Sequence, residues 1–365
     1  MHSRFVTMML FPLALASVAR AESNAQPYFA GMSPDAEMVL IADVESLLAS
    51  PLIQQIQAMV QSMSPSENPN ALPMGLTEFT GATNQDLGKI VVSTRDVMLL
   101  QEIDDPSTVS KEQIEQTGVM LAFQINKGIG ADSFQQWVES VTPPEELAKT
   151  SKSEVGKGLL YNSEGQTGMA MGFLPSDAQT MIFVGSEPSV KTALTTGSGK
   201  LPAKVATAET LSATLPNLAV LAAPSAAWKQ QLVSSADEKF TSAEDAEFIK
   251  QAEQFLFGFN ITDGLTILSG IKFANDAIAN KAYTAMDESI TEFKATPIEP
   301  GPMSLLAPLI NKMQVTEDGD AVTFSTGMNA GESQQMLMML PMLVMSQMSQ
   351  GMGPGGPGMG APAGE

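Results

Sequence analysis

The chain has 365 residues, with 40 Asp and Glu against 19 Lys and Arg, so its formal net charge is −21 at pH 7. It contains no cysteine, and its single histidine is His2. These counts exclude disulfides, thiolate metal sites, cysteine nucleophiles and, beyond His2, any imidazole base or metal ligand. The acidity also opposes binding to nucleic acid, which needs clustered basic side chains.

Residues 1–21 have the three parts of a secretory signal peptide. Arg4 supplies positive charge, an apolar stretch runs from Val6 to Val18, and Ala19–Ala21 forms an A-x-A cleavage site. The apolar stretch is shorter than the ~20 residues of a membrane span. We therefore expect cleavage after Ala21, export to the periplasm or the medium, and no membrane span in the mature chain.

Residues 34–197 are predicted to form a first α+β domain. The apolar, β-branched run Val39–Val44 is typical of a buried strand, and apolar residues at helical spacing follow as far as Val60. Because Pro51 is tolerated only in the first turn of a helix, we expect this helix to begin near Ser50.

A second strand and helix are predicted within residues 117–141, with Asp132 as the helix cap. A hairpin around Ser163–Gly165 and a helix beginning at Glu187 complete this domain. Residues 61–88 contain several prolines and are interpreted as a lid-like loop or a partly ordered insertion.

Residues 198–212 are interpreted as a linker, and residues 213–348 as a second α+β domain. This domain is predicted to open with a strand at Leu218–Ala222 and a helix capped by Ser225. Alternating apolar residues predict a further strand at Leu265–Phe273.

The second domain is predicted to continue with a helix capped by Asn275 or Asp276. A tight turn at Glu317–Asp320 and a last helix beginning at Asn329 follow. The same order of elements thus occurs twice, which predicts an internal duplication. The expected fold class is α+β, with two related domains, each a mostly antiparallel sheet with helices on one face.

The segment "SPDAEMVLIADVESLLASPLIQQI" and the Met/Gly/Pro-rich end resemble uncharacterised secreted proteins of the planctomycete type. The duplicated strand–helix plan is likewise similar to families of unknown function in exported proteins. The resemblance implies a duplicated α+β fold and export. It implies no activity and no functional residues.

The segment Met336–Met348 is rich in methionine. Met339, Met342, Met345 and Met348 recur every third residue, so their thioethers would follow one helix face and could bind Cu(I). The same spacing is typical of a helix packed on a core, which is the favoured interpretation. Residues 349–365 are predicted to be a disordered tail.

Other motifs favour structural roles. The loop Lys127–Ser133 follows a strand as a phosphate loop would, but it lacks the third glycine and predicts an ordinary turn. Glu317, Asp318 and Asp320 supply too few ligands for a calcium loop and predict a hairpin turn. Trp137 and Trp228 are expected in the core.

No set of residues in the sequence combines a nucleophile, a base and a stabilising group, so we assign no catalytic residue and no cofactor. The leading hypothesis is an exported, non-enzymatic structural or interaction protein of the cell envelope. Its expected partner is another envelope or extracellular protein, or a second copy of the chain. The alternatives are Cu(I) binding through the methionine segment and hydrolysis of extracellular polymers by a pair of carboxylates.

Overall fold

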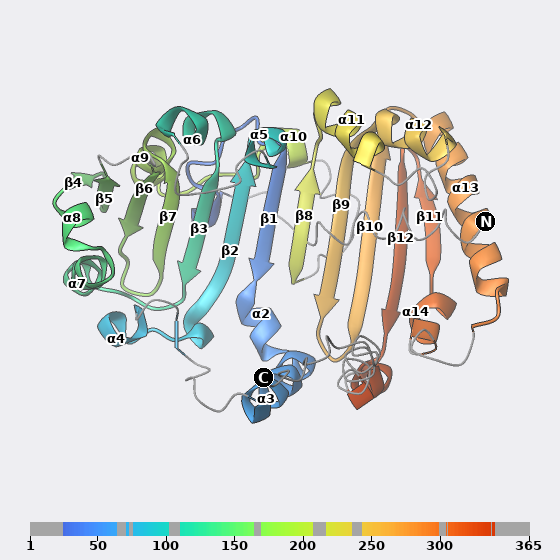
Figure 1. The fold of residues 1–365 in the computed structure, drawn as a ribbon, viewed down its shortest axis with the longest axis horizontal. Coiled ribbons are helices and arrows are strands. Elements are labelled where there is room, and N and C mark those ends of the chain that lie inside the picture. The colour runs from blue at the N-terminus through green and yellow to red at the C-terminus, as the bar shows by residue number, and fades with distance from the viewer. Residues whose placement is uncertain are drawn as a thin grey trace, which may run out of the picture.

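The computed structural model describes residues 25–63, 71–72, 76–101, 110–163, 169–206, 217–235, 243–298, 304, 306–336 and 338–339. These residues form one sheet of 12 antiparallel strands in the order β11-β12-β10-β9-β8-β1-β2-β3-β7-β6-β5-β4, with helices around it (Figure 1). The α+β class with antiparallel pairing is therefore confirmed. No helix in the described residues is long and apolar enough to cross a membrane.

The strands have the following bounds: β1 Met38–Asp43, β2 Leu87–Thr94, β3 Met120–Ile125, β4 Thr150–Val155, β5 Gly158–Ser163, β6 Met169–Leu174, β7 Thr180–Ser186, β8 Leu218–Ala222, β9 Ala252–Ile261, β10 Leu265–Phe273, β11 Gln314–Asp318 and β12 Ala321–Met328. The α-helices are α2 Val44–Ala49, α3 Pro51–Met63, α4 Leu76–Thr80, α5 Val97–Gln101, α6 Lys111–Thr117, α7 Ala131–Val141, α8 Pro144–Leu147, α9 Glu187–Thr196, α10 Ala203–Ala206, α11 Ala226–Ser235, α12 Ala243–Gln251, α13 Asp276–Ala295 and α14 Ala307–Asn311.

The two halves of the chain share this sheet, because β1 pairs with β8 from Met38↔Ala222 to Ala42↔Leu218. We call this pairing the seam. From the seam outward, the first half has the order β1-β2-β3-β7-β6 and the second β8-β9-β10-β12-β11, so corresponding strands occupy corresponding places. Strands β5 and β4 extend the first half alone. This repeated order supports an internal duplication, which stays a prediction.

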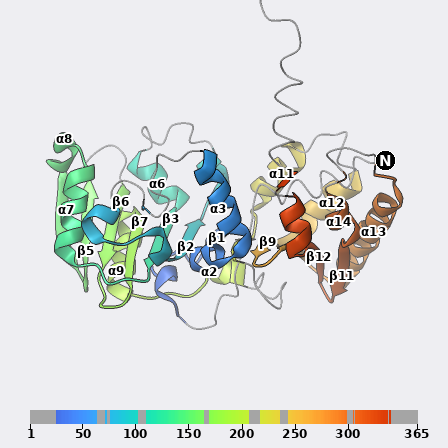
Figure 2. The same ribbon diagram turned by 90° about the horizontal axis from the view of Figure 1, so that it is seen from below.

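Helices α7 and α9 lie on opposite faces of the first half (Figure 2). On β7, Phe183 packs with the buried side chains of α9, whereas Ile182 packs with those of α7. We call the face covered by α9 the α9 face. We call the opposite face, covered by α7, the α13 face, because the strand registers place Ile182 on the same side of the sheet as the side chains under α13. The sequence predicts helices on one face, and the first half differs because β7 is apolar at odd and even positions alike.

In the second half, β12 is buried on the α13 face, where its Val322 and Phe324 pack with side chains of α13. Buried and half-buried residues alternate along the whole of β12. Its α9 face carries Ala321, Thr323, Ser325 and Gly327, which are half-buried. A strand with this alternation needs a covering layer on one side only.

Several predicted elements are confirmed. The strand Leu218–Ala222 has the predicted bounds. Ser225 caps α11 by accepting a hydrogen bond from the Trp228 N–H at 3.4 Å. Asn275 likewise caps α13, and Asn329 accepts a hydrogen bond from the N–H of Glu332 at 3.0 Å, where the last helix begins.

Two predictions need correction. The helix α3 begins at Pro51, as predicted, but a separate short helix, α2, precedes it, and the two are divided at Ser50, which is extended because it precedes proline. Helix α7 is capped by Gly130, so Asp132 lies in its first turn. The predicted signal peptide (1–21), the tail (349–365) and most of the turn at Ser163–Gly165 lie outside the described residues.

Candidate functional site

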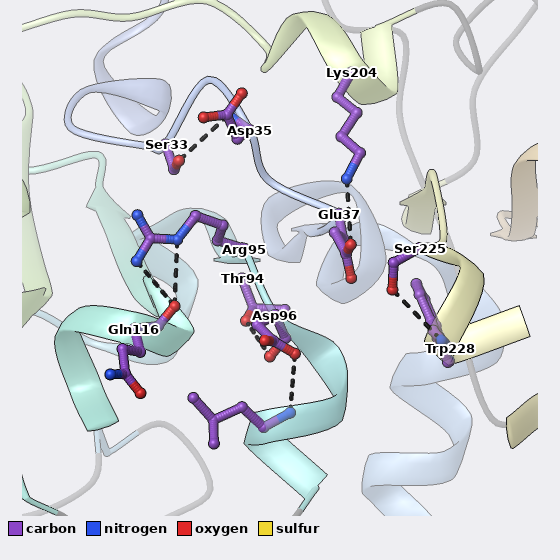
Figure 3. Close-up of polar contacts among 11 residues, drawn as sticks. Ser33, Asp35, Glu37, Thr94, Arg95, Asp96, Gln116, Lys204, Ser225 and Trp228 are labelled. Atoms are coloured by element: carbon purple, nitrogen blue, oxygen red, sulfur yellow. Dashed lines mark hydrogen bonds and ion pairs between the residues drawn. The ribbon is translucent and has the colours of Figure 1, made fainter. Parts of the chain in front are cut away.

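One cluster of polar side chains lies where β1, β2 and β8 end at the seam (Figure 3). Glu37 continues β1 beyond its first residue: its N–H donates to the Thr94 carbonyl at 2.9 Å, and its carbonyl accepts from the Ala223 N–H at 2.8 Å. Its side chain is buried, and Lys204 of α10 donates to Oε1 at 3.2 Å. The second oxygen, Oε2, is buried without a hydrogen-bond partner in the described structure.

The other side chains in this cluster bind backbone groups. Arg95 donates from Nε to the Gln116 carbonyl at 3.2 Å, which ties the end of β2 to α6. Asp96 accepts from the Leu99 N–H at 3.0 Å and so caps α5. The cluster therefore holds α5, α6 and α10 against the seam. Its contacts are an ion pair, hydrogen bonds to backbone carbonyls and a helix cap.

Acid catalysis by a carboxylate pair requires at least one carboxyl group with a raised pKa. Three described carboxyl groups have shifted pKa values, and all three are lowered: Asp43, Glu187 and Glu332. For Asp43, burial would raise the pKa, but hydrogen bonds from Lys89 and Ser46 outweigh it. For the other two, the first cause is a hydrogen bond from a lysine side chain. These groups are stabilised as anions, which suits ion pairs rather than proton donation.

Among the described residues, the lysine and the tyrosine with shifted pKa values lie in different halves of the sheet. Burial lowers the pKa of Lys229, whose Nζ donates to the Lys250 carbonyl at 3.4 Å and so joins α11 to α12. Burial raises the pKa of Tyr161 on β5, which packs beneath α7 in the other half. Among the residues that the structure describes, no group of three or more His, Cys, Asp and Glu could hold a metal ion.

Of the four candidate copper ligands, the structure describes Met339 alone, which is helical and half-buried. Met342, Met345 and Met348 lie outside the described residues, so the Cu(I) hypothesis stays a prediction. Among the described residues, the neighbouring Met338 is the large apolar side chain that is exposed, at 67%.

The three motifs adopt the local structures predicted for them. The loop after β3 is a strand–helix turn, in which Lys127 donates to the Gly81 carbonyl. Strands β11 and β12 are joined by a tight turn with Gly319 at a φ of 58°. Trp137 and Trp228 are 8% and 2% exposed, as core residues are.

An apolar surface crosses the seam on the α13 face. One row of cross-strand partners runs across the sheet on this face, from Ile90 through Ala42, Leu218 and Phe259 to Ile267. Val92 and Leu121, which are direct partners in the next row, continue it into the first half. The six side chains other than that of Ala42 are half-buried. We call these six residues the apolar strip: Ile90, Val92, Leu121, Leu218, Phe259 and Ile267.

Sequence analysis missed half of this strip because it did not predict β2 and β9. These strands lie beside β1 and β8, and they carry Ile90, Val92 and Phe259. Both had a local signal. "KIVVS" is β-branched, and "FLFGFNI" places phenylalanine at alternate positions.

No protein-family model and no curated protein matches the chain. Among solved structures, the chain is similar to the crystal structure of TP0453, a Treponema protein, with a TM-score of 0.36 and 8% identity over 87% of this chain and 98% of that one.

Proposed function

We propose that the protein is an exported, non-enzymatic interaction protein of the cell envelope, and that the apolar strip is its docking surface. The observation that carries the proposal is the row of half-buried aliphatic and aromatic side chains across the seam. Contiguous exposed apolar surface is costly in water and marks sites of interaction.

The position of the strip supports a binding role. Five of its six members lie on β2, β3, β8 and β9, around the seam, so the surface is made by both halves together. Its cross-strand neighbours are held in register by the central ladders of the sheet. A rigid apolar surface of this kind suits the apolar side of a partner segment, since little ordering is required on binding.

The polar groups support the non-enzymatic part of the proposal. The described carboxyl groups with shifted pKa values are all stabilised as anions, and the cluster at the end of the seam binds backbone. Saturable turnover of a glycan or an ester by the purified protein would overturn this part.

The test places a photoreactive phenylalanine analogue at Phe259 in the native host. We expect one discrete protein adduct, identified by mass spectrometry, that is lost when the neighbouring Ile267→Gln is added. The same analogue at Thr323, on the α9 face, is the position control, and Thr266→Gln is the matched substitution control. An adduct of equal yield at Thr323, or none at Phe259, would contradict the proposal.

A further inference from the structure

We propose that the protein forms a dimer in which strand β4 pairs with the same strand of a second copy. β4 is the last strand of the sheet on the side of the first half, and in the part of the chain that the structure describes its one neighbouring strand is β5 (Figure 1). Residues 151–154 of β4 are exposed. An edge strand of this kind presents backbone N–H and C=O groups that can pair with another chain. This inference does not depend on the proposed function.

The backbone groups that can accept a second strand belong to Lys152 and Glu154. A turn of two residues joins β4 to β5, so Val155 and Gly158 form the hydrogen-bonded pair that closes the hairpin. Along an antiparallel ladder, residues bonded to the neighbouring strand alternate with residues whose N–H and C=O groups point away from it. Counting back from Val155, Lys152 and Glu154 are of the second kind. Their backbone groups therefore point outward from the edge of the sheet.

The charges on β4 select one register for the pair. An antiparallel pair centred on Ser153 places Lys152 of each copy opposite Glu154 of the other, and opposite charges on facing residues stabilise a sheet. The outward backbone groups of these residues then form two hydrogen bonds for each facing pair. A pair centred on Lys152 or on Glu154 would instead place like charges opposite each other. Charged side chains often protect an edge strand from pairing, but in the Ser153 register they attract.

The opposite edge of the sheet, β11, differs in both respects. β11 carries Glu317 and Asp318 but no basic residue, so a second β11 would bring only like charge. Helix α13 packs against β11, and its Asn280 donates to Glu317 Oε2 at 3.1 Å. Pairing of β4 with β11 would also build open chains of molecules, whereas pairing of β4 with β4 closes at a dimer. The two copies are therefore expected to meet at β4.

The expected dimer is weak and symmetric. One pair of short strands buries less area than the roughly 1,600 Å² of a stable interface, so we expect the dimer to dissociate on dilution. Facing residues of an antiparallel pair lie on the same side of the sheet, so the two-fold axis is perpendicular to the sheet. Both apolar strips thus lie on one side of the doubled sheet. A partner with two binding segments would gain affinity from this arrangement.

The chain has no cysteine, which permits a test with single cysteines in the full-length protein. Ser153→Cys should form a disulfide between two copies under mild oxidation. The reason is that facing residues without mutual hydrogen bonds have Cα atoms about 4.5 Å apart, within the range of a disulfide. Ser151→Cys is the matched control, because Ser151 is an exposed serine on the same face of β4. In the proposed register its two copies lie about 14 Å apart. Non-reducing gels measure the covalent dimer.

The second measurement is the dissociation constant of the dimer, obtained by sedimentation equilibrium of full-length variants. Lys152→Glu should weaken the dimer by about tenfold, because it replaces two attractive pairs by two repulsive ones. Adding Glu154→Lys should restore the dimer, since each facing pair again has opposite charges. Lys281→Glu, at an exposed position on α13, changes the net charge equally and should leave the dimer unaltered.

These outcomes decide the proposal. Faster disulfide formation at Ser153 than at Ser151, together with loss and recovery of the dimer in the charge variants, supports it. A chain that stays monomeric, disulfide formation at Ser151 that equals or exceeds that at Ser153, or a dimer unaffected by Lys152→Glu overturns it. Neither measurement involves the apolar strip, so photoreactive capture at Phe259 tests the proposed function separately.

Discussion

Strands β7 and β12 occupy the same place in their halves of the sheet, yet their faces differ. Phe183 of β7 lies opposite Ala122 and Gly172, and Thr323 of β12 lies opposite Gly270 and Thr316. Both side chains point to the α9 face, where Phe183 is fully buried. Thr323 is half-buried and shares a hydrogen bond of 2.6 Å with Thr316.

The difference teaches that one strand order supports two kinds of layer. In the first half, buried apolar residues on both faces of β7 require helices on both faces. In the second half, alternation along β12 requires a helix on the α13 face alone. The covering helices follow the strand pattern, and the order of the strands does not determine them.

The largest expected effect comes from truncating Phe183, the buried residue of the pair Phe183 and Thr323. Phe183→Ala should lower the free energy of unfolding by about 3–5 kcal/mol, because it leaves a cavity beneath α9. Thr323→Ala should cost less than about 1 kcal/mol, since it removes one partly exposed hydrogen bond. Urea denaturation followed by tryptophan fluorescence measures both. Equal losses would show that the two halves are buried alike.

A smaller effect should come from filling the contact between α9 and β6. A Cβ added at Gly172 would lie 2.5 Å from Cγ1 of Val190, which is fully buried and β-branched and cannot easily move away. Gly172→Ala should therefore cost about 1–3 kcal/mol through overpacking. Ser325→Ala, at a half-buried position on the same face of the second half, should be nearly neutral. Thermal melts of the two variants compare them directly, and an unchanged melting temperature for Gly172→Ala would contradict close packing of α9.

The sequence predicts those elements of the fold whose signals are local. Ser225 and Asn275 cap helices because a short polar side chain reaches the N–H groups of the next turn. The turn before Ala321 has the acidic residues and glycine that such turns require. In contrast, the pairing of Ala42 with Leu218 joins residues far apart in the chain, and no local pattern identifies a strand's partner.

The apolar strip could not be predicted from the sequence for the same reason. Leu218 was predicted to lie on a strand, but its exposure depends on which strands and helices surround it. Val220, two residues along the same face, is buried beneath Trp228. One strand thus carries a core residue and a surface residue on the same face, which its own sequence pattern does not distinguish.

A third prediction concerns the seam that joins the two halves. Lys204→Ala should cost about 1–2 kcal/mol, because it leaves the buried carboxylate of Glu37 without its cation. The loss is limited because the Lys204 side chain is 40% exposed. Adding Glu37→Gln should recover part of the stability, since a neutral amide is less costly to bury alone. A double-mutant cycle in urea measures the coupling, and strictly additive losses would contradict the ion pair.

The smallest expected effect lies at the other end of the seam strand β1, where Asp43 accepts from Lys89 at 2.6 Å and from the Ser46 N–H at 3.0 Å. Burial raises its pKa, but these hydrogen bonds outweigh burial and lower it. A carboxyl group whose pKa is lowered by folding adds stability above its unfolded pKa of about 4, and that stability is lost as the pH falls through the folded pKa. Asp43→Asn keeps a helix cap but loses the ion pair. It should cost about 1 kcal/mol at pH 7 and little near pH 2. Unfolding free energies measured across this range check the prediction, and a variant with the unaltered pH dependence would show that Asp43 contributes through its cap alone.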